Sequence, residues 1–437
     1  MTTDSLSNAV RVVIVGAGFA GFEAAEQITR KAKKSNTNVA VTLVSADDFM
    51  LYTPLLPEVA GGLLDPRFVA VPLNQTLPGV DVIAGRVESV DLDGKQVQYV
   101  GRGGETAVVP WDRLVLTPGS VTRLFDIPGL REHALGLKST TEALYLRDQL
   151  LRELELASQT EDSALAEQHR TVVIVGASYA GTELVSQMRA LADEVAEKRH
   201  FDPSSVRFVL LDVAKQVMPE VGDKLSHKVL DVLRERGIDV RLETSLESVS
   251  ADHVVLTDGT RVPTRTVVWA AGVTANPLIA TLGLPTEKGR LKVGTDLAVD
   301  GHPDVFAAGD AAAVPDLTEP GSVTPPTAQH AIRQGKALAR NVLASVGTGT
   351  AKPYKHSNLG LVVDLGPGFA VANPVGVHLS GLPAKAVTRG YHLFSLPRGV
   401  NRWAVAMGYV TDVFADRSLV SFGTVTGDEA KFYAQGR

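Results

Sequence analysis

Three glycines near the start of the chain have the spacing of a turn that holds a pyrophosphate. Gly16, Gly18 and Gly21 fit the pattern G-x-G-x-x-G. The first glycine permits a tight turn, the second lets the backbone approach the pyrophosphate, and the third lets a helix pack against a strand. A helix that begins after such a turn adds free N–H groups and a partial positive charge. The glycine pattern alone is weak evidence for nucleotide binding, so the segments on either side of it must be considered as well.

The segments around the turn predict a strand–turn–helix unit, and the chain contains this unit twice. Residues 12–15 are apolar and mostly β-branched, which is typical of a strand buried on both faces, and residues 22–30 are expected to be helical. Residues 171–181 repeat the unit almost residue for residue, with Ser178 in place of the middle glycine. Two units predict two nucleotides, a flavin that stays bound and a nicotinamide that exchanges.

The residues that end the predicted strands differ between the two units. An acid usually ends the second strand of such a unit and binds the ribose hydroxyls. The first unit has Ser45 there, which can still form a hydrogen bond. The second has Asp212, which favours NADH because a carboxylate repels a 2′-phosphate. A later apolar run ends in Asp310, which is interpreted either as a helix N-cap or as a ligand of a cofactor's ribityl chain.

Several other elements follow from local patterns. Residues 87–100 predict a hairpin turning at Asp93 and Gly94, and residues 140–155 predict an amphipathic helix. Prolines in residues 53–62 predict a surface loop, because proline interrupts helices. Residues 158–169 are polar and predict a linker.

Composition limits the class of protein. The 437 residues suggest two or three domains, and a net charge of −6 gives no case for nucleic-acid binding. The chain has no cysteine, so a redox-active disulfide is excluded. No apolar run approaches the roughly 20 residues that span a bilayer. The first ten residues lack the features of a signal peptide, so we expect a cytoplasmic protein. No metal site is predicted.

Six segments, read in order, resemble the type II NADH dehydrogenases, single-chain FAD enzymes that pass electrons from NADH to quinone. These segments are FMLYTPLLPEVAGG, LVLTPGS, IPGLREHALGLKSTTEALYLRDQLL, VVWAAGV, GHPDVFAAGDAA and PPTAQHA. The resemblance covers nearly the whole chain, and PPTAQ is its most specific part.

The resemblance and the repeated unit together imply an α/β fold with two Rossmann-like domains. Residues 1–140 and 290–350 are expected to form a discontinuous FAD domain, with an inserted NADH domain at residues 141–289. Residues 351–437 are expected to form a C-terminal α/β segment on the acceptor side. The implied activity is transfer of hydride from NADH to FAD and of electrons onward to a quinone.

The resemblance and the motifs assign candidate ligands to both nucleotides. The expected FAD ligands are Gly16, Gly18, Phe19, Ala20, Gly21, Ser45, Thr53, Pro54, Leu55, Val87, Thr117, Pro118, Gly119, Gly309, Asp310, Ala328 and Gln329. The expected NADH ligands are Gly176, Ser178, Tyr179, Ala180, Gly181, Glu183, Asp212, Ala271, Gly272 and Val273.

Three residues are candidates for a direct part in the reaction. Glu183 corresponds to a glutamate of the family near the nicotinamide, where it could orient the carboxamide or relay a proton; alternatively, it is an exposed helix residue. Gln329 borders the quinone pocket by resemblance, and Arg333 lies one helical turn further on. Arg333 stands where the family commonly has glutamine, and it either favours a quinone that gains negative charge or pairs with a carboxylate.

The C-terminal segment leaves its role open. Trp403, Met407, Val410 and Phe414 form a helical stripe that is core, dimer contact or membrane face. A basic excess, from Lys385, Arg389, Arg398, Arg402 and Arg417 against Asp412 and Asp416, would suit the inner face of a membrane or a solvated surface. The alternative functions are a flavin reductase or oxidase with a soluble acceptor and a nucleotide-binding redox sensor.

Overall fold

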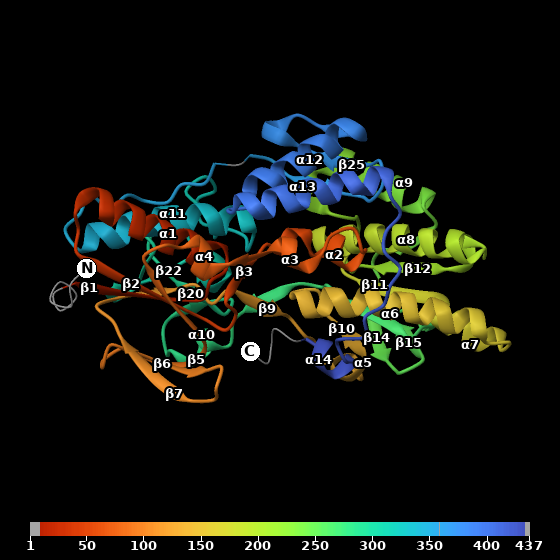
Figure 1. Cartoon of the computed structure of the whole chain (residues 1–437), viewed down its shortest axis with the longest axis horizontal. Helices are drawn as coiled ribbons and strands as arrows, with labels where there is room; N and C mark the ends of the chain where they lie inside the picture. The colour runs from red at the N-terminus through yellow and green to blue at the C-terminus, as the bar shows by residue number, and fades with distance from the viewer. Residues whose placement is uncertain (1–8, 358, 433–437) are drawn as a thin grey trace.

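The computed structural model describes residues 9–357 and 359–432, and it shows an elongated molecule with two halves (Figure 1). The absence of a signal peptide was predicted largely from residues 1–8, which lie outside the described residues. Each half is built around one sheet, so the predicted α/β class is confirmed. The larger sheet has the order β21 (Ala298–Val299), β22 (His302–Ala307), β8 (Arg113–Leu116), β1 (Val10–Val15), β2 (Val39–Ser45), β5 (Val80–Asp91), β6 (Gln96–Gly101) and β7 (Thr106–Pro110).

The first strand–turn–helix unit occupies the middle of this sheet. β1 pairs in parallel with β2 on one side and with β8 on the other, and its last four residues are buried. α1 (Phe19–Ser35) follows the glycine turn and packs against α11 (Ala328–Ser345). The hairpin β5–β6 turns where predicted, and the Asp91 carboxylate accepts a bond from the Gly94 N–H at 2.9 Å.

The second unit occupies the middle of the smaller sheet in the same way. That sheet has the order β10 (Ala134–Leu135), β17 (Thr266–Trp269), β11 (Thr171–Val175), β12 (Arg207–Leu211) and β13 (Ile238–Arg241), all parallel. Helices of this half are α6 (Thr140–Gln159), α7 (Ser163–Arg170), α8 (Tyr179–Arg199) and α9 (Asp223–Glu235). The repeat in the sequence is therefore a repeat in the structure, and the predicted helix at 140–155 is confirmed as α6.

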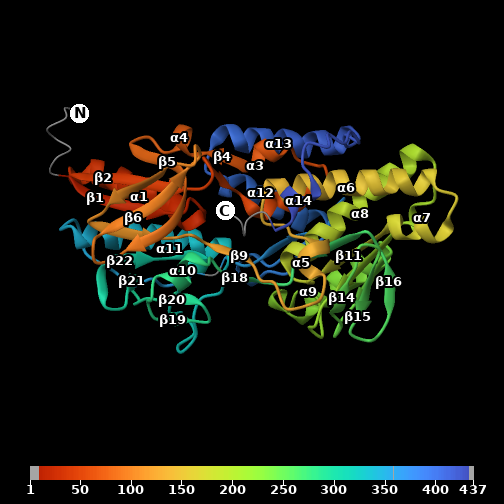
Figure 2. The same ribbon diagram turned by 90° about the horizontal axis from the view of Figure 1, so that it is seen from below.

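Smaller elements join and cover the halves. β9 (Ser120–Thr122) pairs antiparallel with β18 (Val273–Ala275), and Figure 2 shows this pair between the two halves. The small sheets contain β3 (Phe49–Leu51) and β4 (Ala70–Pro72); β14 (Leu246–Val249), β15 (His253–Leu256) and β16 (Arg261–Pro263); β19 (Thr286–Glu287), β20 (Arg290–Lys292) and β23 (Ala312–Ala313); and β24 (Val362–Asp364), β25 (Ala370–Ala372) and β26 (Leu379–Ser380). The short helices are α3 (Pro66–Val69), α4 (Leu73–Thr76), α5 (Leu130–His133), α10 (Leu278–Thr281), η3 (Pro203–Ser205), η4 (Pro219–Val221) and η6 (Pro374–Gly376).

The predicted surface loop at residues 53–62 and the predicted linker at residues 158–169 are wrong, because each segment contains a helix. In residues 53–62, η2 (Thr53–Leu55) leads into α2 (Leu56–Ala60), whose residues are all buried. Their prolines occupy positions in the first turn of each helix. An N–H group there has no partner within the helix, so proline, which lacks this group, costs no hydrogen bond. In residues 158–169, α7 is capped by Asp162, whose carboxylate accepts bonds from the next turn.

The C-terminal segment covers the junction between the halves. α12 (Leu382–Ser395) and α13 (Gly399–Phe414) lie across it, and the chain then descends to α14 (Gly427–Ala430) beside α6 (Figures 1 and 2). Arg147 of α6 binds the segment between α13 and α14 by donating to the backbone oxygens of Ser418 and Val420 at 2.6 and 2.8 Å. In the part of the chain that the structure describes, no helix is both long and apolar enough to span a bilayer.

Candidate active site

The first glycine turn has one position that faces open space and two that are filled by backbone. Gly16 has φ +91°, and a Cβ there would lie 2.4 Å from the Thr117 carbonyl oxygen. A Cβ on Gly21 would lie 1.9 Å from the Gly16 carbonyl oxygen. Around a Cβ on Gly18 there is no heavy atom within 4 Å. The outer glycines are thus required by packing, and the middle one leaves room for a ligand.

A cavity of about 910 Å³ begins at this turn. Its volume lies at the upper end of the range for cofactor sites. Twelve of the expected FAD ligands line it: Gly16, Gly18, Phe19, Ala20, Ser45, Thr53, Val87, Thr117, Pro118, Gly119, Gly309 and Asp310. A cavity of this size, lined by a glycine turn and a helix N-terminus, fits FAD, and the open space at Gly18 would admit its pyrophosphate.

The remaining expected FAD ligands do not line this cavity. Gly21 packs helix on strand, and Leu55 is fully buried in the core. Pro54 lies beside it in η2, and Ala328 and Gln329 lie at the start of α11, outside the cavity lining. Their assignment to FAD stays a prediction.

Two polar residues that sequence reasoning missed join Asp310 in the cavity wall. Ser120 donates a hydrogen bond to the Asp310 carboxylate at 2.6 Å, and Lys138 donates to the Ser120 hydroxyl at 3.1 Å. Burial lowers the pKa of Lys138, while Asp310 and Glu142 oppose that shift. Asp310 lies inside η5 (Gly309–Ala311), so the N-cap alternative is wrong. Ser139 and Glu142 have the spacing of a capping box, which marks the start of a helix. Lys138 directly precedes this start, and the pattern was the one signal in the sequence that pointed to its position.

The second glycine turn has nearly the same geometry. Gly176 has φ +109°, and a Cβ there would lie 2.6 Å from the Ala270 carbonyl oxygen; a Cβ on Gly181 would lie 1.8 Å from the Gly176 oxygen. Ser178 has φ −85°, which any residue adopts, so serine replaces the middle glycine without strain. Tyr179 and Ala180 begin α8.

The acid at the end of β12 lies against this turn. The Asp212 carboxylate accepts bonds from the Ala177 and Ala214 N–H groups at 2.6 and 2.7 Å. The backbone of Ala270 and Ala271, after β17, passes beside Gly176. Gly272 follows, and Val273 begins β18. The residues expected to bind NADH are thus gathered at the carboxyl end of the smaller sheet, where α/β folds bind ligands.

The two acceptor-side candidates contact each other. Arg333 donates to the side-chain oxygen of Gln329 at 3.0 Å, and Gln329 donates to the Gly360 carbonyl at 2.7 Å. α11 begins at Ala328 as predicted, which sets this one-turn spacing. Among the described residues Arg333 forms no ion pair, so the carboxylate-pairing alternative finds no partner there.

Glu183 is buried, so its interpretation as an exposed helix residue is wrong. The side chain is 8% exposed, and its carboxylate accepts a bond from the Asp364 N–H at 2.8 Å. Burial, and then the nearby Glu58, raise the pKa of Glu183 well above its ordinary value. Burial, and then Asp364, raise the pKa of Glu58 to about 8.

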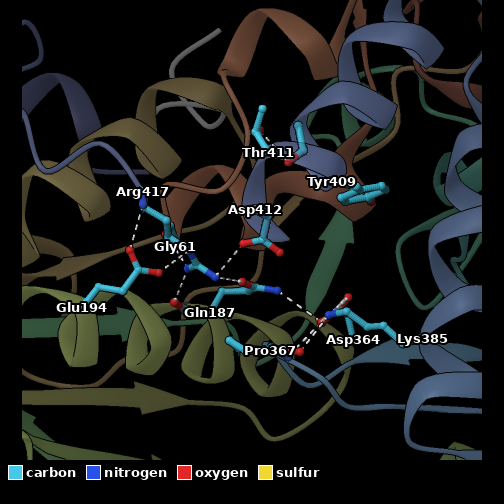
Figure 3. Close-up of polar contacts among 12 residues, drawn as sticks. Gly61, Gln187, Glu194, Asp364, Pro367, Lys385, Tyr409, Thr411, Asp412 and Arg417 are labelled. Carbon is cyan, nitrogen blue, oxygen red and sulfur yellow. Dashed lines mark hydrogen bonds and ion pairs between the residues drawn. The ribbon is translucent and has the colours of Figure 1, made fainter. Parts of the chain in front are cut away.

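The basic residues of the C-terminal segment mostly point inward, contrary to the surface excess that the sequence suggested. Lys385 binds Asp364 at 2.6 Å, Arg389 binds Asp412 at 2.7 Å, and the guanidinium of Arg417 lies between Glu194 and Asp412 (Figure 3). Two of these partners, Asp364 and Glu194, lie outside the stretch whose charges were counted, and Asp412 binds both Arg389 and Arg417. Of the five, Arg402 is exposed and Arg398 is half-buried without an ion pair among the described residues.

The apolar stripe of α13 points outward, so its interpretation as core is wrong. Trp403 and Phe414 are 74% and 84% exposed. Other exposed apolar side chains extend this face of α12 and α13: Phe394, Val400, Met407, Val410 and Val413. An apolar face of this extent marks an interaction surface.

Known proteins share both the fold and the sequence pattern. Residues 10–335 match the family described as pyridine nucleotide-disulphide oxidoreductase. Two type II NADH:quinone oxidoreductases of Mycobacterium tuberculosis, Ndh and NdhA, are 31% and 32% identical over 88% and 91% of this chain, and over 83% and 86% of their own lengths. The solved structure of NDH2 from Plasmodium falciparum in complex with NADH superposes with a TM-score of 0.87 at 17% identity, covering 94% of this chain and 100% of that one. The chain therefore belongs to the type II NADH:quinone oxidoreductases within the pyridine nucleotide-disulphide oxidoreductase family.

Proposed function

We propose that the protein oxidises NADH and reduces a quinone, using FAD held in the cavity at the first glycine turn. The observation that carries this proposal is the duplicated unit, with an FAD-sized cavity at one copy and an acidic strand end at the other. FAD, when bound, supplies the capacity to take a hydride and to release electrons. The M. tuberculosis relatives are named for this activity.

The chain's own residues bind and orient the two nucleotides. Gly18 leaves room for the FAD pyrophosphate, and Ser45 lies where it can bond a ribose hydroxyl. Asp310 lines the cavity, accepts a hydrogen bond from Ser120 and suits the ribityl chain. On the other side, Asp212 suits the ribose hydroxyls of NADH, and Glu183 is placed to hold a proton near the second turn.

An acceptor assay tests this function. Purified protein in lipid vesicles should oxidise NADH far faster with a ubiquinone analogue than with oxygen or free flavin. A soluble flavin reductase or oxidase would show the reverse order. Tight NADH binding without turnover of any acceptor would indicate a redox sensor.

Arg333 and Gln329 are proposed to border the quinone, which a guanidinium favours as negative charge develops on it. Replacing Arg333→Gln should change the rate of quinone-dependent reoxidation severalfold and leave reduction by NADH nearly unchanged. The matched control is Arg340→Gln on the same helix, where the guanidinium bonds the Lys352 carbonyl. Unchanged reoxidation in a folded variant removes Arg333 from the site, and slowed reduction by NADH means that it lies on the nicotinamide side.

The exposed apolar face of α12 and α13 is proposed to rest on a membrane, which brings the acceptor site to the quinone pool. Its aromatic and aliphatic side chains, with Arg398 and Arg402 at the surface nearby, suit the boundary of an anionic bilayer. The full-length protein should float with phosphatidylglycerol vesicles, and the double change Trp403→Asp and Phe414→Asp should abolish flotation. Val108→Asp, an exposed apolar site on β7, is the control.

A dimer is the alternative use of the same face. Flotation that survives the double change, together with a drop from dimer to monomer mass in light scattering, would assign the face to a second copy. The location at the inner face of the cell membrane stays a prediction.

A further inference from the structure

A second cavity, of about 370 Å³, lies beside the first turn of α13. It is enclosed by α13, α3 and the ribbon of β3 and β4, and Figures 1 and 2 show α13 beside α3. Its apolar wall includes Phe49, Phe68, Val400 and Ala404. The volume is within the range of small-ligand sites, and the proposed reaction makes no use of it.

Asn401 joins two walls of this cavity and leaves one of its own atoms unpaired. The side chain is 4% exposed, and its Nδ2 group donates to the carbonyl oxygens of Arg67, Phe68 and Ala70 at 3.3, 2.9 and 3.0 Å. These three acceptors fix the orientation of the amide, because its oxygen would repel them. Among residues 9–357 and 359–432, the buried Oδ1 atom has no hydrogen-bond partner. A ligand that carries an O–H or N–H group would supply the missing donor.

The charged groups around the cavity leave one cation without a counterion. Asp48 pairs with Arg102 at 3.0 Å, and Arg67 pairs with Asp65 at 2.8 Å. Arg398 instead donates to a neutral glutamine side chain of α4 at 2.7 Å, and it forms no ion pair in the part of the chain that the structure describes. Three guanidinium groups thus face two carboxylates, and the surplus positive charge favours an anion.

The first turn of α13 adds to this preference for an anion. The N-cap residue of this helix of 16 residues is Arg398, and no side chain of the described residues caps the first turn. Uncapped N–H groups and the helix dipole favour negative charge. Val400, Asn401 and Ala404, from the beginning of the helix, all line the cavity. A phosphate group suits this end of the cavity, because it accepts hydrogen bonds from both a guanidinium and backbone N–H groups.

The cavity is continuous with the exposed apolar face of α12 and α13. Val400 lines the cavity and is 63% exposed, and Trp403, next to the lining residue Ala404, is 74% exposed. A free phosphate would leave the apolar wall uncovered, whereas a phospholipid covers it. Because the cavity is too small for a whole phospholipid, the acyl chains of a lipid bound here would extend along the exposed face.

We infer that this cavity binds the headgroup of one phospholipid. The phosphodiester lies at Arg398 and the first turn of α13, and a hydroxyl or ammonium group of the headgroup donates to Asn401. Phosphatidylglycerol has this chemistry. The inference rests on the proposed membrane contact, and it adds a specific lipid site to it. Because Phe49 lines both this cavity and the FAD cavity, a lipid held here would fix the flavin site relative to the bilayer.

A short-chain lipid tests the site without a bilayer. Full-length protein with its FAD is titrated calorimetrically with dihexanoyl phosphatidylglycerol below its micelle concentration, and one molecule should bind saturably. Dihexanoyl phosphatidylcholine, whose headgroup has no donor, should bind severalfold more weakly. Glycerol 3-phosphate and inorganic phosphate, which lack acyl chains, should bind at least about tenfold more weakly. No saturable lipid binding, or equally tight binding of inorganic phosphate, would overturn the inference, and equal binding of phosphatidylcholine would overturn the role of Asn401.

Two variants and one control locate the bound lipid. Arg398→Gln should weaken binding of the short-chain phosphatidylglycerol by about tenfold or more, as expected for loss of a hydrogen bond between charged groups. Ala404→Phe fills the cavity without changing its charge and should abolish binding. The matched control is Arg402→Gln, an exposed arginine of α13 outside the cavity lining, which should bind within about twofold of wild type. Wild-type affinity in either folded cavity variant would overturn the inference.

Flotation separates this site from the proposed membrane contact. Ala404→Phe should still float with phosphatidylglycerol vesicles, because Trp403 and Phe414 supply the apolar contact. Wild-type protein that binds the short-chain lipid but does not float would contradict the membrane contact and leave the lipid site standing. Wild-type protein that floats but shows no saturable binding of the short-chain lipid would overturn the site and leave the membrane contact standing.

Discussion

The two nucleotide-binding units share their turns and differ in what surrounds them. A Cβ on Gly16 or Gly176 would lie 2.4 or 2.6 Å from a backbone oxygen, and one on Gly21 or Gly181 would lie 1.9 or 1.8 Å from one. These positions are dictated by packing of helix on strand. The backbone of the turn is therefore the same in both units, and residues outside the turn determine which nucleotide each unit binds.

The helices after the turns show the difference most clearly. Glu23 and Gln27 of α1 occupy the same helical positions as Glu183 and Gln187 of α8. In α1 the two side chains bond each other at 2.8 Å, whereas in α8 both bind Asp364 of the C-terminal segment, at 2.8 and 3.2 Å. The same local pattern is thus a partly buried pair within one helix in one half and part of a buried site with the C-terminal segment in the other.

The largest expected effect comes from adding a methyl group to either turn. Gly16→Ala should yield protein without FAD or no folded protein, because the positive φ and the backbone clash together destabilise the turn by at least about 1–3 kcal/mol. Gly176→Ala should keep FAD and raise the KM for NADH more than tenfold. Flavin content after denaturation and steady-state kinetics measure both. Loss of FAD from Gly176→Ala alone would reverse the assignment of the two units.

A pH series compares Glu58 of α2, which raises the pKa of Glu183, with Glu23 of α1. Because the pKa of Glu58 is raised from 4.5 to about 8, the folded protein binds more protons than the unfolded chain between these values. The free energy of unfolding should therefore fall as pH rises through this window, by up to about 1.4 kcal/mol per pH unit, and level off above it. Glu58→Gln should flatten the slope in urea unfolding, and Glu23→Gln should change it less. Parallel curves for wild type and Glu58→Gln would contradict this account.

Exchanging the strand-end residue tests nucleotide choice. Asp212→Ser gives the second unit the residue that the first has at Ser45. It should narrow the preference for NADH over NADPH by about 1.5–3 kcal/mol, the range for losing a hydrogen bond to a charged group. The ratio of kcat/KM values measures this change. An unchanged ratio would mean that Asp212 serves only the Ala177 and Ala214 N–H groups.

The smallest effect is expected at the middle of each turn. Gly18→Ser should fold normally, because its φ of −65° suits any residue and its Cβ faces open space. FAD affinity should fall modestly, since the new side chain lies where the pyrophosphate is expected. Ser178→Gly should tighten NADH binding by a few-fold, and isothermal titration measures both changes. A destabilised Gly18→Ser variant would show that this position is not open.

The sequence correctly predicted the elements that are determined by residues close together in the chain. The two units, the hairpin at Asp93 and Gly94 and the start of α11 depend on neighbouring residues, and all three are confirmed. The helix η2–α2 was missed because its prolines were interpreted without their helical position.

Features made by distant partners could not be predicted from the sequence. Arg417 and Glu194 lie 223 residues apart, so their pairing and the burial of the C-terminal basic side chains depend on the complete fold. Ser120 and Lys138 in the cavity wall, and Glu58 beside Glu183, were missed for the same reason. In each case the residue type was visible, but its neighbours were not.

An anaerobic titration tests the central claim, that the two similar units serve two different nucleotides. The protein, freed of small molecules by gel filtration, should still carry FAD, and about one equivalent of NADH should remove its visible flavin absorbance. The same amount of NADPH should leave most of that absorbance, and added quinone should restore what NADH removed. Colourless protein that FAD does not reconstitute, or an equal response to NADPH, would contradict the account.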